Sequence, residues 1–178
     1  MSFWSEDAWP SIFRSRLGKL EDEALSDVLA GIEWDALRSF VRSLPPSWRL
    51  ALVRLWSSAL LTSSRTGRGH RPCLFCFHDG ADRFPHFVRC AAVRRLASET
   101  FRSDMEAWSL VRLLGFMSRE LIAVAPAVFL ALLYQKARHC EDLTLARKHA
   151  AELLIRPLSY SDRLLLRLPM RGAAAGDV

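Results

Sequence analysis

The sequence has few features of a secreted, disulfide-linked or membrane-spanning protein. Only four of its 178 residues are cysteines, and no basic stretch followed by an apolar run begins the chain, so no secretory signal is predicted. The longest apolar run, residues 121–134, is shorter than the roughly 18 residues that a membrane span needs, and Pro126 interrupts it. We therefore expect an intracellular protein, nuclear or cytoplasmic, in which clustered cysteines favour a metal over disulfides.

Motifs for polymerase and nuclease chemistry are also missing. The chain contains no Tyr-x-Asp-Asp sequence and, after the cysteine segment, no Pro-Asp followed by a further acidic residue and a lysine. Such chemistry needs clustered carboxylates that hold two divalent metal ions. The acidic residues here are scattered along predicted helices, so we expect no enzyme activity.

Positive charge is present in excess and is unevenly distributed. The net charge is +6, but residues 1–45 carry five basic and eight acidic side chains, whereas residues 46–102 carry ten and three. Nearly all of the basic residues are arginines, whose planar guanidinium groups suit phosphate. An arginine-rich composition can also reflect a GC-rich genome alone, so the bias permits a polyanionic partner without requiring one.

Apolar residues recur at helical spacing through most of the chain, and no run alternates apolar and polar residues as a half-buried strand does. The predicted helices span residues 5–17, 21–30, 34–44, 47–61, 82–96, 104–116, 119–138 and 142–155. Asp82 is the expected cap of the fifth, which holds Pro85 in its first turn. We predict a mainly α fold, a small helical domain with a short zinc-binding finger between its helices. Its segments are 1–61 (helical), 62–102 (basic finger), 103–171 (helical) and 172–178 (disordered tail).

Two pairs of residues are candidate metal ligands. Cys73 and Cys76 are separated by two residues, a spacing that lets both thiolates face one ion, and His86 and Cys90 are four apart, on one face of a helix. Together they form a closed set of four ligands that suits one structural zinc ion and leaves no position for a substrate. Phe77 stands where a haem-attachment motif needs histidine.

Other residues near this segment are weaker candidates. His78 follows Cys76 too closely for a compact tetrahedron, and His70 precedes the first cysteine. Cys140 lies far along the chain and is expected to be a half-buried thiol. A redox role for Cys73 and Cys76 remains an alternative, although no strand and helix surround them as in thiol oxidoreductases.

Arginine and phenylalanine surround the proposed ligands. Arginines could contact phosphate, and aromatic rings could stack on bases, as in proteins that bind RNA or single-stranded DNA. For Phe84 and Phe87 we expect core packing instead, and the arginines can equally form a solvated face. The candidate nucleic-acid contacts are Arg65, Arg68, Arg71, Arg83, Arg89, Arg94 and Arg95.

Residues 56–95 resemble the zinc-binding segment near the C-terminus of non-LTR (LINE-type) retrotransposon reverse transcriptases. Leu60-Leu-Thr-Ser-Ser-Arg65 matches the approach to that motif, Cys73-Leu-Phe-Cys76 its first pair, and His86-Phe-Val-Arg-Cys90 its second pair. The polar pair that usually precedes the histidine is replaced here by Asp82-Arg83. The resemblance covers about a quarter of the chain.

The resemblance implies a non-catalytic module that binds an RNA template or a DNA target, with other parts of a retroelement protein as expected partners. It also implies that this chain is a detached or decayed piece of such an enzyme. A protein-interaction or purely structural module, in which zinc only holds helices together, is the alternative.

Overall fold

The computed structural model describes residues 8–60, 62, 71–79, 82–140, 142–159 and 166. In these ranges the regular structure is entirely helical and contains no strand, which confirms the predicted mainly α class. The helices are α1 (Trp9–Leu17), the 3-10 helix η2 (Gly18–Leu20), α2 (Glu23–Gly31), α3 (Trp34–Ser43), α4 (Pro46–Trp56), α6 (Phe84–Arg89), α7 (Ala91–Phe101), α8 (Leu110–Leu113), α9 (Leu121–Ala137) and α10 (Leu143–Ile155).

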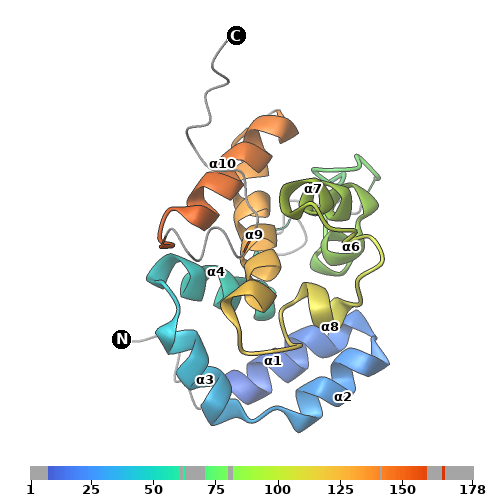
Figure 1. Cartoon of the computed structure of the whole chain (residues 1–178). Coiled ribbons are helices and arrows are strands. Elements are labelled where there is room, and N and C mark those ends of the chain that lie inside the picture. The colour runs from blue at the N-terminus through green and yellow to red at the C-terminus, as the bar shows by residue number, and fades with distance from the viewer. Residues whose placement is uncertain are drawn as a thin grey trace.

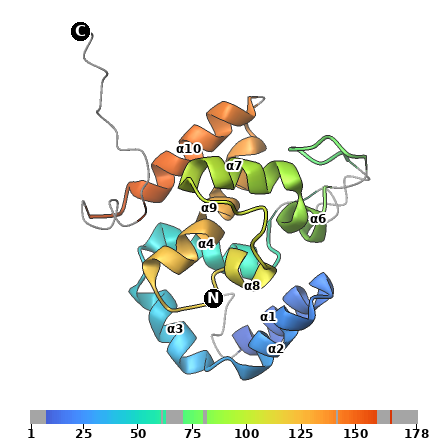
Figure 2. The ribbon, with the colours of Figure 1, turned by 45° about the vertical axis from the view of Figure 1, so that its right-hand side comes forward.

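The long helix α9 runs through the middle of the molecule (Figures 1 and 2). Every residue from 124 to 134 is buried, so this helix has no polar face, as expected for a helix surrounded by others. Helices α4, α7 and α10 all pack against it. The apolar run that is too short to span a membrane is therefore the centre of the core, and no described helix is both long and apolar enough to cross a bilayer.

Two buried tryptophans join distant parts of the chain to α4. The indole N–H of Trp48 donates a hydrogen bond of 2.9 Å to the carbonyl oxygen of Leu154, and that of Trp56 donates one of 2.9 Å to Leu114. Both rings are fully buried, so each side chain contributes apolar area while its one polar group is satisfied. The ends of α10 and α8 are thereby fixed to α4.

The N-terminal helices lie at the end of the molecule opposite α10 (Figure 1). Trp9, Phe13 and Leu17 of α1 are buried at the four-residue spacing visible in the sequence. Asp22 caps the N-terminus of α2: its carboxylate accepts a hydrogen bond of 2.9 Å from the Leu25 N–H and so satisfies one free amide of the first turn.

Three predicted helices differ from those observed. The helix expected over 47–61 ends at Trp56, because the chain turns at Ser58, which has a φ of +54°. The helix expected over 82–96 is two helices, α6 and α7, separated at Cys90, whose ψ of 120° is extended. Of the helix expected over 104–116, only the four residues of α8 are helical.

Buried side chains from all three predicted segments belong to one hydrophobic cluster. Helix α7, beside the cysteine segment, and α10, near the C-terminus, both pack on α9. The division at residues 61/62 and 102/103 stays a prediction about the chain, and the tail at 172–178 lies outside the described residues.

Candidate metal centre

The first ligand pair lies on a tight hairpin, residues 71–79, which we call the finger hairpin. The N–H of Cys73 donates to the carbonyl oxygen of His78 at 2.9 Å, and the N–H of Phe77 donates back to the Cys73 carbonyl oxygen at 3.0 Å. Phe77 has a left-handed φ of +58°, and the Phe75 N–H points at the Cys73 sulfur, 3.4 Å away. This turn brings Cys73 and Cys76 to the same side of the hairpin.

The second pair comes from the break between α6 and α7, so the prediction that His86 and Cys90 share one face of a single helix is wrong. His86 lies on α6, which begins with Phe84 and Pro85, a suitable residue for a first turn. The chain leaves α6 at Cys90, and the Cys90 carbonyl oxygen accepts the first hydrogen bond of α7, from the Arg94 N–H at 3.0 Å. The Cys90 thiol is thereby held at the N-terminus of α7, a position that favours a thiolate.

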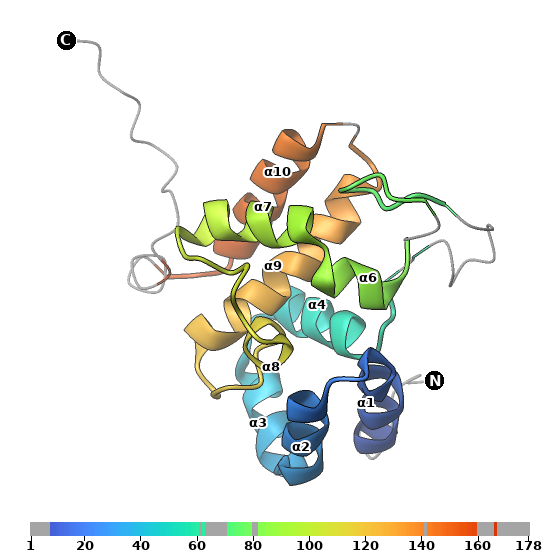
Figure 3. The same ribbon diagram turned by 90° about the vertical axis from the view of Figure 1, so that its right-hand side faces the viewer.

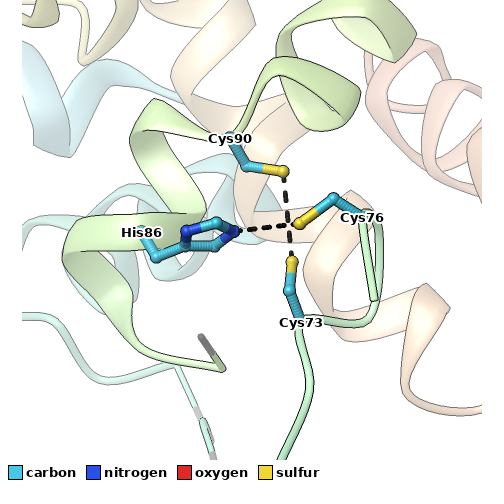
Figure 4. Close-up of side chains that lie close together, drawn as sticks. All are labelled: Cys73, Cys76, His86 and Cys90. Carbon is cyan, nitrogen blue, oxygen red and sulfur yellow. Dashed lines mark hydrogen bonds between the residues drawn. The ribbon is translucent and has the colours of Figure 1, made fainter. Parts of the chain in front are cut away.

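The four side chains point toward one common centre (Figure 4). Their ligand atoms all lie within 4.8 Å of one another, with the Cys73 and Cys90 sulfurs 4.0 Å apart and the Cys76 sulfur 3.2 Å from Nε2 of His86. Zinc–sulfur bonds of about 2.3 Å in a tetrahedron would place two sulfurs about 3.8 Å apart. The donor group, Cys73, Cys76, His86 and Cys90, can therefore hold one metal ion with little movement.

Hydrogen bonding within the donor group changes the acidity of two thiols. The hydrogen bond between the Cys73 and Cys90 thiols, together with burial, raises the pKa of Cys73 to about 12. The same hydrogen bond lowers the pKa of Cys90, to which the N–H groups of Val93 and Ala92 also contribute, against the effect of burial. The pair thus keeps a proton on Cys73, and a metal ion must displace that proton to bind both sulfurs.

The types of donor atom favour some metal ions over others. Three thiolates and an imidazole are soft to borderline ligands in a set of four, which suits zinc better than magnesium or calcium. Cys73 and Cys90 are buried, whereas Cys76 is exposed and His86 half-buried. Because all four positions are taken by protein, an ion here would have no free position for substrate or water.

A tyrosine from the central helix connects this centre to the core. The hydroxyl of Tyr134, on α9, donates a buried hydrogen bond of 2.7 Å to Asp82, which lies between the two ligand pairs. Its ring contacts Phe87 at 5.1 Å and Phe75 at 6.4 Å between centroids, so one side chain contacts a residue within each ligand pair. Burial and the hydrogen bond to Asp82 raise the pKa of Tyr134, which keeps its hydroxyl protonated.

Sequence reasoning missed this connection and misplaced Asp82. The cap of α6 is Arg83, not Asp82, because the Asp82 carboxylate faces Tyr134. The only sequence signal was a lone hydroxyl near the end of the apolar run, a group that needs a partner once it is buried.

The two alternative ligands that the structure describes, His78 and Cys140, lie outside the donor group. His78 is exposed, and its ring stacks beside that of His86 with 6.2 Å between centroids. Cys140 is half-buried, with its sulfur 4.0 Å from Nδ1 of His149. His70 lies outside the described residues. The half-buried thiol expected at Cys140 is confirmed.

Most of the candidate nucleic-acid contacts that the structure describes are on the surface. Arg71, Arg83, Arg89 and Arg95 are exposed, whereas Arg65 and Arg68 lie outside the described residues. Arg89 also donates to the Leu20 carbonyl oxygen, and Arg95 lies 3.8 Å from a carboxylate oxygen of Glu106.

Arg94 has a different environment. It is half-buried, and its guanidinium donates to the carbonyl oxygens of Val88 at 3.3 Å, Glu106 at 2.9 Å and Trp108 at 2.7 Å. Burial, with a smaller contribution from Arg89, lowers its pKa. Arg94 thus fixes the segment between α7 and α8 to α6, while nucleic-acid contact by any of these arginines stays a prediction.

The phenylalanines of the segment divide into two groups. Phe75, Phe84 and Phe87 are buried, which confirms the core packing expected for Phe84 and Phe87. Phe77, at the turn of the finger hairpin, is 71% exposed. Only Phe77 among these four presents its ring to solvent.

Fold and site together define a helical domain with a group of three cysteines and one histidine between its helices that could hold a metal ion. No protein-family model, curated protein or solved structure matches the chain.

Proposed function

We propose that this protein is a non-catalytic module in which one structural zinc ion holds a finger that contacts nucleic acid, RNA or single-stranded DNA. The observation that carries the zinc assignment is the convergence of four ligand atoms within 4.8 Å. The nucleic-acid assignment rests on the charge and exposure of the surface around them.

Zinc has a clear structural task here, because the finger hairpin has little core of its own. Within residues 71–79 only the side chains of Cys73 and Phe75 are buried. Structural zinc contributes on the order of 10 kcal/mol in small zinc-dependent domains. Bonds from the hairpin to His86 and Cys90 would fix it on α6 and α7, and the thiolates imply an intracellular location, nuclear or cytoplasmic, that keeps them reduced.

The finger surface offers the two kinds of contact that single-stranded nucleic acid needs. Arg71 and Arg83 are exposed on either side of the ligand-bearing turn, where guanidinium groups can pair with phosphates. The exposed ring of Phe77 is available for base stacking, which contributes about 1–3 kcal/mol per base in such proteins. The resemblance of residues 56–95 to the zinc-binding segment of LINE-type reverse transcriptases supports the same function.

A second function, protein interaction or purely structural zinc, is favoured by a specific observation. Arg89 and Arg94 both direct hydrogen bonds to backbone carbonyl oxygens within the domain. Part of the positive charge near the finger therefore already serves the fold.

A salt titration separates the two functions. We expect zinc-loaded protein to bind single-stranded RNA with an affinity that falls steeply as salt rises, because phosphate contacts release counterions. Arg71→Gln should reduce the slope of log affinity against log salt by about 1, and Phe77→Ala should weaken binding about tenfold or more with the slope unchanged. Arg16→Gln, an exposed arginine of α1, is the matched control. Equal loss in Arg16→Gln and Arg71→Gln, or no binding, would support the second function.

A further inference from the structure

A large groove has Tyr134 among its lining residues but none of the four metal ligands. It has a volume of about 1050 Å³ and is formed by α4, the C-terminal half of α9 and the end of α10, three helices that lie together in Figures 1 and 3. Binding sites for small organic molecules typically have volumes of about 300–1,000 Å³ and are mostly apolar with a few placed polar groups. The groove is large enough for such a ligand.

Aliphatic side chains form much of the groove wall. Leu50 and Val53 come from α4, Leu132 from α9 and Leu153 from α10, with Leu60 following α4. Leu50 is 51% exposed although it lies on a helix whose neighbouring residues are mostly buried. Covering this exposed apolar area with a ligand would lower the free energy, because the area is then removed from water.

The polar groups around this apolar wall carry charge of one sign. Arg54, Arg138, His139 and Arg156 line the groove, and no acidic side chain is among its described lining residues. Within the part of the chain that the structure describes, the three guanidinium groups form no hydrogen bond or ion pair. Arg138 lies near the Tyr134 hydroxyl and opposes the rise of its pKa. Three arginines with no acidic partner on one groove favour an anionic ligand.

We propose that this groove binds a medium-chain fatty acid through its free carboxylate and its acyl chain. The acyl chain would cover the exposed face of Leu50 and the neighbouring aliphatic residues, and the carboxylate would pair with the guanidinium groups of Arg54, Arg138 or Arg156. A guanidinium presents parallel N–H groups that match the two oxygens of a carboxylate. A nucleic acid or an acidic peptide would use the charge but leave the aliphatic wall uncovered, so the combination favours an acyl chain.

The test is calorimetric titration of the zinc-loaded full chain with octanoate, decanoate and dodecanoate. We expect saturable binding of one molecule per chain, tightening about fourfold for each methylene buried. Dodecanol, which has the chain but not the charge, should bind at least tenfold more weakly than dodecanoate.

Variants locate the site. Arg54→Gln and Arg156→Gln should each weaken dodecanoate binding about tenfold, and Leu50→Gln should weaken it with a reduced dependence on chain length. The matched controls are Arg16→Gln on α1 and Leu145→Gln, whose side chain is 42% exposed on α10 and does not line the groove. Zinc content and circular dichroism of each variant establish that it is folded.

Three results would overturn the proposal. They are absence of saturable dodecanoate binding, dodecanol binding as tightly as dodecanoate, and equal weakening in groove and control variants. Absence of dodecanoate binding together with reduced RNA affinity in Arg54→Gln and Arg156→Gln would make the groove part of a nucleic-acid surface. Because the nucleic-acid proposal is tested separately at Arg71 and Phe77, either proposal can fail without the other.

Discussion

The finger hairpin and the helices around α9 are stabilised by different interactions. In α9, eleven consecutive residues are buried, and α4, α7 and α10 cover them. In the finger hairpin, Cys73 and Phe75 are the buried side chains, and backbone hydrogen bonds close the turn on itself. Apolar burial can hold the first region without help, whereas the second lacks the apolar area to do so.

The two regions are in contact at Tyr134. Tyr134 belongs to α9 and yet contacts Phe75 and Phe87, which lie within the two ligand pairs, and Asp82, which lies between the pairs in the sequence. Tyr134 therefore links the hairpin to the core, and an ion held by the four ligands would add a second link. Changing each element separately should show which region depends on it.

The largest expected effect is local to the finger. Cys90→Ser should abolish stoichiometric zinc binding and unfold the finger hairpin, because a structural zinc contributes on the order of 10 kcal/mol to such units. Hydrogen exchange should lose protection at residues 71–79 and α6 while α9 and α10 stay protected. Cys140→Ser is the control and should keep both zinc and protection. Loss of protection throughout α9 would contradict the separation of the two regions.

A substitution in the core should lower the stability of the helices around α9. Leu133→Ala, at a fully buried position of α9, should lower the free energy of unfolding by about 2–5 kcal/mol through lost burial and a cavity. Urea denaturation should give the same loss with zinc and with chelator. Leu145→Ala, at an exposed position, should change stability by less than about 0.5 kcal/mol. A loss that disappears in chelator would mean that α9 depends on the metal.

An intermediate effect is expected where the regions meet. Tyr134→Phe keeps the ring but removes the hydroxyl that donates to the buried Asp82 carboxylate, which should cost about 1–3 kcal/mol. Competition with a chelating dye should show weaker zinc binding as well, since the hairpin loses its link to α9. Unchanged zinc affinity with reduced stability would restrict Tyr134 to the core.

Zinc affinity should also depend on pH through the paired thiols. The raised pKa of Cys73 means that its thiol is protonated at neutral pH, so zinc binding must release that proton. Affinity should therefore rise with pH, about tenfold per unit for each proton released. Calorimetry in buffers of different ionisation enthalpy counts the protons. Release of none at pH 7 would contradict the assignment of Cys73 as a ligand.

The smallest expected effect distinguishes the two neighbouring histidines. His78→Ala should leave zinc content unchanged, because this side chain is exposed and outside the donor group. His86→Ala should remove a ligand and weaken zinc binding severely. Metal analysis of both variants, purified side by side, makes the comparison, and loss of zinc only in His78→Ala would reverse the ligand choice.

Residue types and spacing were sufficient to predict the donor group, because the members of each pair are only three or four positions apart and so lie close together in the fold. They were not sufficient for the break at Cys90, since the apolar pattern continues across it from Val88 to Val93. The Asp82–Tyr134 hydrogen bond joins residues 52 positions apart. Such contacts depend on how the helices pack, which no local pattern contains.

Arg94 illustrates the same limit for function. In the sequence it is one of several arginines near the finger, and its partners Glu106 and Trp108 contribute backbone carbonyl oxygens. Any residue type offers a carbonyl oxygen, so no pattern of residue types could identify them. The exposed Arg71 and the half-buried Arg94 look equivalent until the chain is folded.

The most direct test of the central claim is the metal content of the purified full chain by elemental mass analysis, with Cys90→Ser measured alongside. We expect one zinc ion per wild-type chain, removed by a strong chelator, and less than stoichiometric zinc in the variant. A wild-type protein without zinc after reconstitution under reducing conditions, or a variant that retains one zinc per chain, would contradict that claim.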